Sequence, residues 1–455
     1  MAHHPLPVAI IGAGPVGLSA AAYLVQRGES FVVFEIGDSV AHSVRAWAHV
    51  RLFSPWRITL DRAAVELLEA SGWQSPDLDQ SPMGSEIISS YLQPLANLPS
   101  IAPHVRLGQR VTGISRQRTD KMKDAGRDAA PFVIRTVDTL TGTESECLAR
   151  AVIDASGTWH TPNPLGADGL ASLGERTYAD RIAYGIPDVL GAEAAHYTGK
   201  RVLVVGSGHS AINTLLALDA LSATAPQTRI LWALRKASVA AAYGGQSDDA
   251  LPERGALGTR LRQLVEAGKL ELHAPFYAHR IQADGDALRV TSTDGDAIIV
   301  DRIVVATGFR PDYSMAGELR LGLDSTVEST PLLAPMIDPN LHSCGTVRPH
   351  GEAELRHPEP NFYVVGMKSY GRAPTFLLAT GYEQVRSVVA ALVGDWEAAR
   401  AVQLELPETG VCCTDNAYGA EVSCCDTGVS AEAVCCTPSV SVRALPLDFI
   451  PLISV

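Results

Sequence analysis

The chain has 455 residues, of which 46% are apolar and 19% are charged, and its formal net charge is −13. This length exceeds what one ordinary hydrophobic core supports, so we expect two domains and additional segments. The acidic balance argues against nucleic acid as a partner, because phosphate binding requires a basic surface. No apolar run reaches membrane-spanning length and no secretory segment stands at the N-terminus, so we expect no membrane partner and a cytoplasmic protein.

A strand–helix–strand pattern opens the chain. An apolar run predicts a buried strand at residues 8–11, and a helix and a second strand are predicted at 18–27 and 31–34. The loop after the first strand has the spacing GxGxxG, in which the glycines permit a tight turn, approach of a pyrophosphate and close helix packing. Free N–H groups at the helix start would face the phosphates, and the acid after the second strand would accept ribose hydroxyls. These features predict a dinucleotide site formed by Gly12, Gly14, Pro15, Val16, Gly17 and Glu35.

An aromatic and basic stretch, residues 43–56, follows this unit. The far end of a bound dinucleotide could lie against it, with Trp47 and Ser54 as candidate contacts. The alternative is a surface loop whose tryptophans belong to the core.

The next part of the chain predicts β-structure. Residues 111–114 and 132–137 alternate as strands do, and the polar stretch 116–128 between them predicts a hairpin loop. A further strand starts at Arg150 and enters a small-residue turn, and the prolines at 162 and 164 indicate a domain boundary.

A second nucleotide-binding pattern begins at Arg201. A strand at 202–205, a glycine-containing loop, a helix at 212–221 and a strand at 229–234 follow one another. The last strand ends in two cations rather than an acid, and cations there suit a 2′-phosphate, so we predict NADPH rather than NADH. The alternative is a solvated strand end, and the histidine of the loop either donates to a phosphate or faces solvent. The candidate residues are Gly206, Gly208, His209, Ser210, Ala211, Arg235 and Lys236.

The remaining elements suggest a return to the first domain. The stretch 301–312 resembles the stretch 153–159, and two such strand-then-turn segments suggest two crossings between domains. A strand is predicted at 362–367, where Gly366 and Met367 are candidate contacts, and a helix at 376–392.

Two Gly-rich units, one nested inside the other domain, together with Asp154-Ala155-Ser156-Gly157 and Ala306-Thr307-Gly308, resemble the two-dinucleotide-binding flavoprotein oxidoreductases. The resemblance covers residues 7–395 and implies FAD in the first unit and NADPH in the second. It implies an α/β fold of two Rossmann-like domains, the second inserted in the first. The implied parts are FAD binding at 1–162 and 311–403, NADPH binding at 163–310, and a cysteine-rich tail at 404–455. Gly157, Thr307 and Gly308 become candidate cofactor contacts.

The loop 206–211 is similar to the NADPH loop of flavin-containing monooxygenases, and the segments 342–351 and 366–381 resemble the flavin-binding monooxygenases of arsenic-resistance operons. One departure concerns the Phe-Gly-His fingerprint that monooxygenases usually carry before the second loop. Here that region reads Ala183-Tyr184-Gly185-Ile186, and only His196 stands nearby. The departure favours a flavin reductase or oxidase as the alternative to oxygenation.

Cysteine positions bear on the electron acceptor. Disulfide reductases of this superfamily keep a redox cysteine pair beside the flavin, but residues 36–60 and 165–310 contain no cysteine. This disfavours the glutathione-reductase and thioredoxin-reductase mechanisms and leaves dioxygen as the simplest acceptor. His49, Arg51 and Lys368 could face the flavin, with structural roles as the alternative, and no general base is identified.

Six of the eight cysteines form three adjacent pairs in the tail. Thiolates select soft ions, so these pairs could collect trivalent arsenic, mercury or copper(I) and pass it inward. The arrangement resembles the vicinal-cysteine tail of mercuric reductase, although the redox pair of that enzyme's core is missing here. The alternative is zinc binding or an oxidation-prone tail. The candidate ligands are Cys412, Cys413, Cys424, Cys425, Cys435 and Cys436.

Together these features predict an FAD- and NADPH-dependent monooxygenase in arsenic or metalloid detoxification, with a small thiophilic substrate and dioxygen as reactants. An NADPH oxidase or flavin reductase, and a metalloid-binding flavoprotein without oxygenation, are the alternatives. The resemblance allows a homodimer, although no stretch marks an interface.

Overall fold

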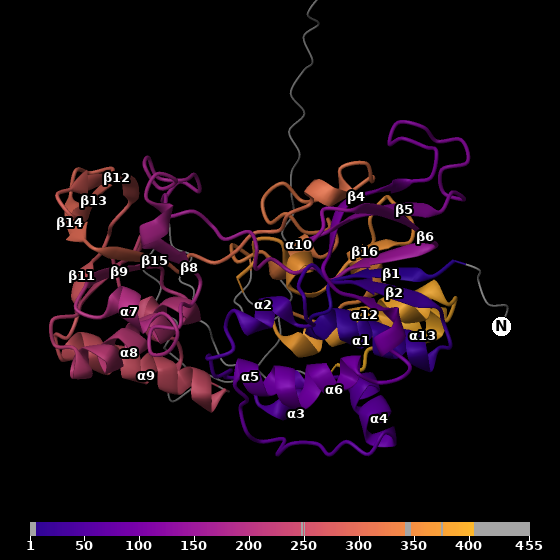
Figure 1. Ribbon diagram of the computed structural model, residues 1–455, viewed down its shortest axis with the longest axis horizontal. Helices are drawn as coiled ribbons and strands as arrows, with labels where there is room; N and C mark the ends of the chain where they lie inside the picture. The colour runs from indigo at the N-terminus through magenta and orange to yellow at the C-terminus, as the bar shows by residue number, and fades with distance from the viewer. Residues whose placement is uncertain (1–5, 247–248, 250, 342–346, 375, 405–455) are drawn as a thin grey trace, which may run out of the picture. The chain divides into compact units, whose positions relative to one another are not determined.

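The computed structural model describes residues 6–246, 249, 251–341, 347–374 and 376–404 (Figure 1). These residues belong to one unit, Met1–Asp415. The six tail cysteines and Cys344 lie outside the described residues, as do residues 342–346 of the segment 342–351 that carried part of the family resemblance.

The first of two parallel five-stranded sheets has the strand order β16-β7-β1-β2-β3. Its strands are β1 (Val8–Ile11), β2 (Phe31–Phe34), β3 (Val105–Arg106), β7 (Ala151–Asp154) and β16 (Phe362–Val364). Strand β1 is paired on both sides, with Val8 opposite Phe31 of β2 and Ala151 of β7. Every residue of the three central strands is buried, as a continuous apolar run predicts for a parallel sheet covered on both faces.

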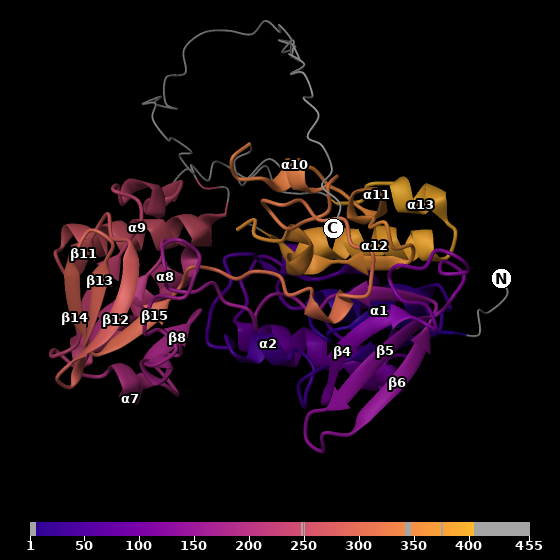
Figure 2. The same ribbon diagram turned by 90° about the horizontal axis from the view of Figure 1, so that it is seen from above.

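The alternation of side chains along these strands determines what covers each face. Val8 and Ile10 belong to the core formed with the helices α1 (Pro15–Gln26) and α12 (Leu378–Leu392). Ala9 and Ile11 belong to the core formed with an antiparallel sheet of β4 (Gln109–Arg116), β5 (Phe132–Asp138) and β6 (Glu144–Ala149). Helix α12 packs beside α1 although the two are far apart in sequence (Figures 1 and 2).

The second parallel sheet has the order β11-β10-β9-β15-β8 and repeats this arrangement. Val202 and Val204 of β9 pack with helices on one face, and Leu203 and Val205 pack on the other face with an antiparallel three-stranded sheet (Figure 2). The elements are β8 (Ile182–Tyr184), α7 (Ala194–Tyr197), β9 (Arg201–Val205), α8 (His209–Thr224), β10 (Arg229–Ala233), α9 (Pro252–Glu266), β11 (Glu271–His273), β12 (Ala278–Asp284), β13 (Ala287–Ser292), β14 (Ala297–Val300) and β15 (Arg302–Val305).

Short helices complete the part that carries the first sheet. They are α2 (His42–Arg45), α3 (Trp56–Thr59), α4 (Arg62–Ala70), α5 (Gly84–Ile87), α6 (Gln93–Ala96), α10 (Ala334–Ile337), α11 (Glu352–Leu355) and α13 (Trp396–Arg400). No helix in the described part of the chain combines the length and the apolar content needed to cross a bilayer.

Several element limits differ from those expected from sequence. Helices α1 and α8 begin at Pro15 and His209, ahead of the expected starts at 18 and 212, because each helix starts directly at its glycine loop. Proline at the first position favours this start in α1, since its fixed φ is already helical. Strand β16 ends before Gly366, whose φ of +72° breaks the extended run, and a 3₁₀ helix (Gly366–Tyr370) follows.

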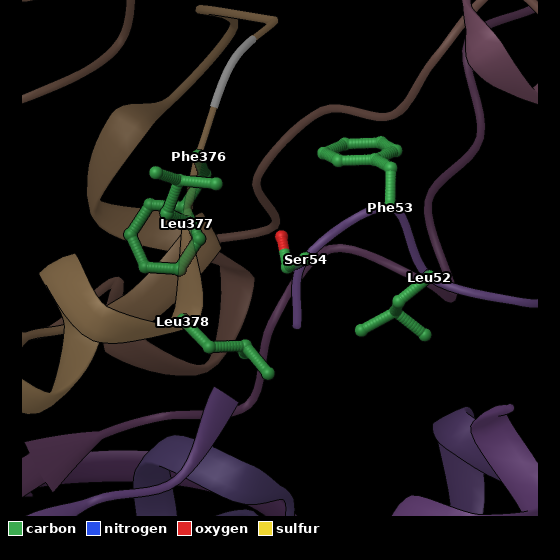
Figure 3. A pocket seen from close by; sticks show the side chains of 6 residues that line it. All are labelled: Leu52, Phe53, Ser54, Phe376, Leu377 and Leu378. Atoms are coloured by element: carbon green, nitrogen blue, oxygen red, sulfur yellow. The ribbon is translucent and has the colours of Figure 1, made fainter. Parts of the chain in front are cut away.

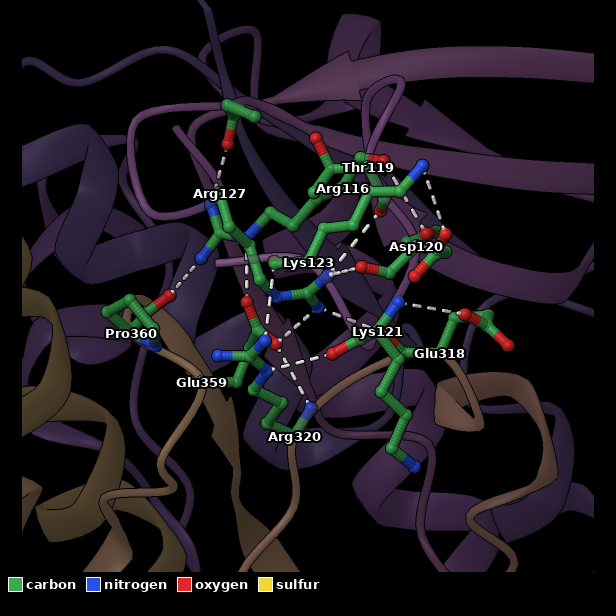
Figure 4. A network of polar contacts seen from close by, with 12 residues as sticks. Arg116, Thr119, Asp120, Lys121, Lys123, Arg127, Glu318, Arg320, Glu359 and Pro360 are labelled. Carbon is green, nitrogen blue, oxygen red and sulfur yellow. Dashed lines mark hydrogen bonds and ion pairs between the residues drawn. The ribbon is translucent and has the colours of Figure 1, made fainter. Parts of the chain in front are cut away.

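Glu359 ties the β4–β5 hairpin loop to the segment before β16 (Figure 4). Its carboxylate accepts hydrogen bonds from Arg116 Nε and Arg127 Nη2, both at 2.7 Å, and from the backbone N–H of Arg320 at 3.0 Å. All three ionic side chains are at most 1% exposed. The polar stretch 116–128 is therefore a loop, as predicted, and it is anchored by buried ion pairs.

Candidate functional site

The first glycine loop has the geometry that the GxGxxG spacing predicts. Gly12 has a φ of +100°, and a Cβ there would lie 2.7 Å from the carbonyl oxygen of Ala155. A Cβ at Gly17 would lie 1.9 Å from the carbonyl oxygen of Gly12, so the third glycine is required for close packing. Gly14, in contrast, would place a Cβ with no atom within 4 Å, which leaves its backbone open to a ligand.

The second loop repeats this geometry. Gly206 has a φ of +128° and a Cβ there would lie 2.3 Å from the carbonyl oxygen of Ala306, whereas the space at Gly208 is open. Ala211, at the third position, is fully buried. The indole of Trp232 donates to the carbonyl oxygen of Gly206 at 2.8 Å and fixes the loop from β10.

Both loops lead into long helices with uncapped starts. Gly14 and Gly208 are the N-cap residues of α1 and α8, neither start has a side-chain cap, and no acid stands in either first turn. Unpaired N–H groups and the positive end of the helix dipole make such a start an anion site. The two loops therefore fit the phosphates of two dinucleotides.

Glu35 lies at the first loop, where its carboxylate already accepts hydrogen bonds from the protein backbone. Its carboxylate is 5% exposed and accepts hydrogen bonds from the backbone N–H groups of Ala13 at 2.7 Å and Gly37 at 2.9 Å. A carboxylate has about four acceptor sites, so a bond to a ribose hydroxyl stays compatible with this bracing role.

The predicted cations follow β10. Arg235 and Lys236 are exposed, and Arg235 donates to the carbonyl oxygen of Ala167 at 3.2 Å. Because the carboxyl ends of parallel strands meet at one edge, these cations share an edge of the sheet with the Gly206–Gly208 loop.

His209 packs against Phe53 rather than standing in solvent. The two ring centroids are 4.9 Å apart, and the guanidinium carbon of Arg254 lies 6.0 Å from the Phe53 ring centroid. Burial, with a contribution from the charge of Arg254, holds the pKa of His209 below its usual value. We therefore expect a neutral imidazole at the start of α8.

The aromatic and basic stretch divides between core and loop. Trp47 packs against the core and against Gly84, where a Cβ would lie 2.9 Å from its ring. Arg51 donates to the carbonyl oxygen of Ser81 at 2.6 Å, and the buried Nε2 of His49 has no hydrogen-bond partner among the described residues. These contacts favour a structural role for Trp47 and Arg51 over a contact with a bound cofactor.

Lys368 is buried and ion-paired. Its Nζ lies 2.7 Å from Asp154 Oδ2 and 3.1 Å from the hydroxyl of Ser156, and it stands 5.3 Å from the Tyr313 ring centroid. This contact links the turn after β7 to the 3₁₀ helix after β16. Next to these residues, Gly157 is open on its Cβ side, and Met367 is half-buried.

A buried amide network, which sequence reasoning missed, holds Gly366. The backbone N–H of Gly366 donates to Gln384 Oε1 at 2.7 Å, and Gln384 Nε2 lies 2.9 Å from both His350 Nε2 and the Ser369 hydroxyl. His350 Nδ1 faces the carbonyl oxygen of Arg348 at 3.0 Å, so Nδ1 carries the proton and Nε2 accepts. Burial lowers the pKa of His350, which agrees with this neutral form.

Asn163 joins the segment that follows the Gly157 turn to the turn that ends in Gly308. Its backbone N–H donates to the carbonyl oxygen of Gly308 and its side-chain amide to that of Thr307, both at 2.9 Å. The hydroxyl of Thr307 donates back to the carbonyl oxygen of Asn163 at 3.2 Å. The two segments that connect the sheets therefore run together.

A pocket of about 110 Å³ lies between the aromatic stretch and the start of α12 (Figure 3). It is lined by Leu52, Phe53, Ser54, Phe376, Leu377 and Leu378. No group of three or more potential metal ligands gathers anywhere in the described ranges, and the tail cysteines are outside them.

Two phosphate loops on two parallel sheets define an oxidoreductase that binds two dinucleotides. The pyridine nucleotide-disulphide oxidoreductase family matches residues 9–335, and the chain belongs to that family. A ferredoxin–NADP reductase of Gluconobacter oxydans (strain 621H) is 29% identical over 356 residues, which cover 75% of this chain and 83% of that protein.

Solved structures share the fold. The bacillithiol disulfide reductase of Bacillus cereus superposes with a TM-score of 0.61 at 18% identity, covering 85% of this chain and 99% of that one. The FAD-bound cadaverine monooxygenase of Erwinia amylovora gives 0.58 at 14% identity, with 89% and 97% covered.

The family and its relatives indicate that the protein is an FAD-dependent oxidoreductase that uses NADP(H). The open glycines and uncapped helix starts fit these cofactors. When bound, they supply the hydride and electron transfer, and the protein supplies position and electrostatics.

Proposed function

We propose that this oxidoreductase is an NADPH-dependent monooxygenase that oxidises a small thiophilic molecule, with a trivalent arsenical as the substrate class. The observation that carries the proposal is the cysteine distribution. Cys147, the only cysteine in the described ranges, is half-buried in β6, and burial raises the pKa of its thiol. Such a thiol is a poor nucleophile. The described residues therefore give no support to electron transfer through a cysteine disulfide, and dioxygen is the simplest electron acceptor.

The proposed reaction balances without further reactants. NADPH supplies two electrons and the trivalent arsenical supplies two, and together they reduce dioxygen. One oxygen atom joins the arsenic, which becomes pentavalent, and the other leaves as water with a proton from solvent.

The roles of the loops follow from this proposal. FAD would bind at Gly12, Gly14, Pro15, Val16, Gly17 and Glu35, and NADPH at Gly206, Gly208, His209, Ser210, Ala211, Arg235 and Lys236. The segments 1–162 and 311–403 would form the FAD-binding domain, and 163–310 the NADPH-binding domain.

The tail supports the substrate class. Three adjacent cysteine pairs offer soft thiolate ligands, which favour trivalent arsenic over hard ions. We propose that they capture the substrate for the flavin site.

A second candidate function comes from the relatives. The relative from Gluconobacter oxydans named above is a ferredoxin–NADP reductase, so an iron–sulfur protein is the alternative acceptor. An NADPH oxidase that releases hydrogen peroxide is the third outcome.

The test measures NADPH oxidation, oxygen uptake, hydrogen peroxide and arsenic speciation with the FAD-loaded protein. We expect one pentavalent product for each NADPH oxidised and little hydrogen peroxide. Peroxide equal to NADPH, unaffected by arsenical, would establish the oxidase, and fast ferredoxin reduction without oxygen would establish the reductase. A chain truncated after residue 404 is the matched control, since only capture by the tail predicts a higher KM for it.

A further inference from the structure

A buried hydrogen-bond network encloses Gly366, one of the predicted FAD contacts, and Gln384 and His350 complete it. We propose that these two side chains are positioning residues for FAD: Gln384 fixes the backbone of Gly366, and a neutral His350 fixes the orientation of the Gln384 amide. This inference rests on the proposed FAD site and adds two residues that act on it through Gly366.

Gly366 lies beside the first phosphate loop. It follows β16 at the carboxyl edge of the first sheet, the edge at which parallel sheets bind their ligands. Its φ of +72° is in the left-handed region, and a Cβ there would lie 3.3 Å from Val16 of the loop. A rotation of either peptide group of Gly366 would therefore change the surface next to the loop that is predicted to hold the pyrophosphate.

Side chains hold both polar backbone groups of Gly366. Its N–H donates to Gln384 Oε1 at 2.7 Å, and its carbonyl oxygen accepts from the Ser369 hydroxyl, also at 2.7 Å. The same hydroxyl accepts from Gln384 Nε2 at 2.9 Å, which closes a ring of hydrogen bonds. Because Gln384 is fully buried and Ser369 is 4% exposed, water does not replace a bond that is lost here. One amide therefore controls the conformation of Gly366.

The orientation of this amide depends on the protonation of His350. Its Nδ1 carries the proton and faces the carbonyl oxygen of Arg348 at 3.0 Å, so its Nε2 is an acceptor. This Nε2 accepts from Gln384 Nε2 at 2.9 Å, which leaves Gln384 Oε1 directed at Gly366. A second proton on His350 would place two donors face to face, and the amide would have to turn its NH2 group toward the Gly366 N–H. The network therefore requires the neutral imidazole.

The surroundings of His350 keep it neutral. The ring of Tyr370 lies 5.6 Å from it between centroids, and the carboxylates of Glu354 in α11 and Glu383 in α12 act on its charge. Each carboxylate accepts a hydrogen bond from another neighbour. Burial lowers the pKa of His350 below its usual value and outweighs the Arg348 carbonyl and the two acids, which raise it. At neutral pH the imidazole therefore holds the amide in the orientation that Gly366 requires.

The experiment follows FAD release from the loaded protein on dilution, from pH 6 to pH 8, with the fluorescence of free FAD as the readout. Gln384→Glu keeps one oxygen for Gly366 and places the other against the lone pair of His350 Nε2, so the network then needs one shared proton. Because this proton is lost as pH rises, the FAD affinity of Gln384→Glu relative to the wild type should fall by up to about tenfold per pH unit. His279→Gln, at an exposed histidine of β12, is the control and should match the wild type at every pH.

A double variant tests the link between the two residues. In His350→Gln combined with Gln384→Glu, the amide at position 350 turns its NH2 group toward the carboxylate and does not titrate. The double variant should therefore lose the pH dependence of Gln384→Glu and recover FAD affinity at pH 8, which a role in packing alone does not predict.

Two results would overturn the inference. One is a Gln384→Glu variant whose FAD affinity relative to the wild type is the same at pH 6 and pH 8, which would reduce Gln384 to a packing role. The other is a double variant that keeps the pH dependence of Gln384→Glu, which would show that His350 is not the partner in the titration.

Turnover separates this inference from the proposed function, because FAD release involves no arsenical. The expected pH dependence together with arsenical oxidation by the wild type supports both. The expected pH dependence without any arsenical oxidation supports the positioning residues and refutes the substrate class of the proposed function. Arsenical oxidation together with a pH-independent Gln384→Glu variant refutes the positioning residues alone.

Discussion

Lys368 Nζ and Asp154 Oδ2 lie 2.7 Å apart, and both side chains are at most 2% exposed. The pair joins the last residue of β7 to the 3₁₀ helix that follows β16, and these two strands are neighbours in the first sheet. The turns that follow these strands contain the candidate cofactor contacts Gly157 and Gly366. The pair therefore acts as a fixed brace between two loops at the carboxyl edge of the sheet.

Removing one partner of this pair should be costly. Lys368→Met leaves Asp154 buried without its counter-charge, which typically costs about 3–5 kcal/mol of unfolding free energy. Urea unfolding followed by circular dichroism measures the loss. Replacing the exposed Lys123 by Met is the control and should stay near the wild type.

The double variant Lys368→Met with Asp154→Asn tests the cause. If the buried carboxylate is the problem, the double variant should recover more than half of the lost stability. No recovery would mean that Lys368 stabilises the protein through packing alone.

NADPH selectivity should depend on the cations after β10. Replacing both Arg235 and Lys236 by Ala should lower kcat/KM for NADPH at least about tenfold, by loss of charge-assisted bonds to the 2′-phosphate, and leave NADH use unchanged. Arg229→Ala, at the exposed opposite end of the same strand, is the matched control. Equal losses with both nucleotides would contradict the assignment.

The loops could be predicted from sequence because their determinants are local. In each unit the glycine-rich loop, the preceding apolar run and the following helix stand within about 30 residues of one another, the usual size of such a unit. The covering of each sheet face follows similarly from the alternation in Val8 to Ile11. The missed contacts are long-range: Lys368 meets Asp154 across 214 positions, and Gln384 meets His350 across 34. A buried Lys or Gln has no sequence signature that names its partner, because the fold alone brings the two together.

The open glycines allow ligand binding to be separated from folding. Gly14 and Gly208 have φ values of −82°, which any residue adopts, and free space at the Cβ position. Alanine at either position should change the unfolding free energy of the cofactor-free protein by less than about 0.5 kcal/mol. Gly14→Ala should nevertheless weaken FAD binding at least about tenfold, because the methyl group occupies the pyrophosphate approach.

Gly208→Ala should weaken NADPH binding and spare FAD, as measured by flavin fluorescence and by the KM for NADPH. Gly17→Ala is the contrast, since its methyl group would overlap a backbone carbonyl and should unfold the loop itself. FAD affinity unchanged in Gly14→Ala would remove the first loop from the cofactor site.

Stability should also depend on pH through Asp61. This carboxyl is the N-cap of α4, accepting from the Ala64 N–H at 3.0 Å, and burial raises its pKa to about 7. The folded protein therefore keeps a proton that the unfolded chain releases near its ordinary value of about 4. The contribution of Asp61 to the unfolding free energy should be highest below pH 4. It should fall as pH rises from 4 to 7, by up to about 1.4 kcal/mol per pH unit.

Asp61→Asn isolates this effect, because asparagine keeps the cap and cannot ionise. Urea unfolding at pH 5 and pH 8 should show a smaller difference for the variant than for the wild type, with the variant the more stable of the two at pH 8. An equal pH dependence in both proteins would show that a group other than Asp61 causes it. His350 and His357 act in the opposite direction to Asp61, because burial lowers their pKa values and their contribution to stability increases as pH rises.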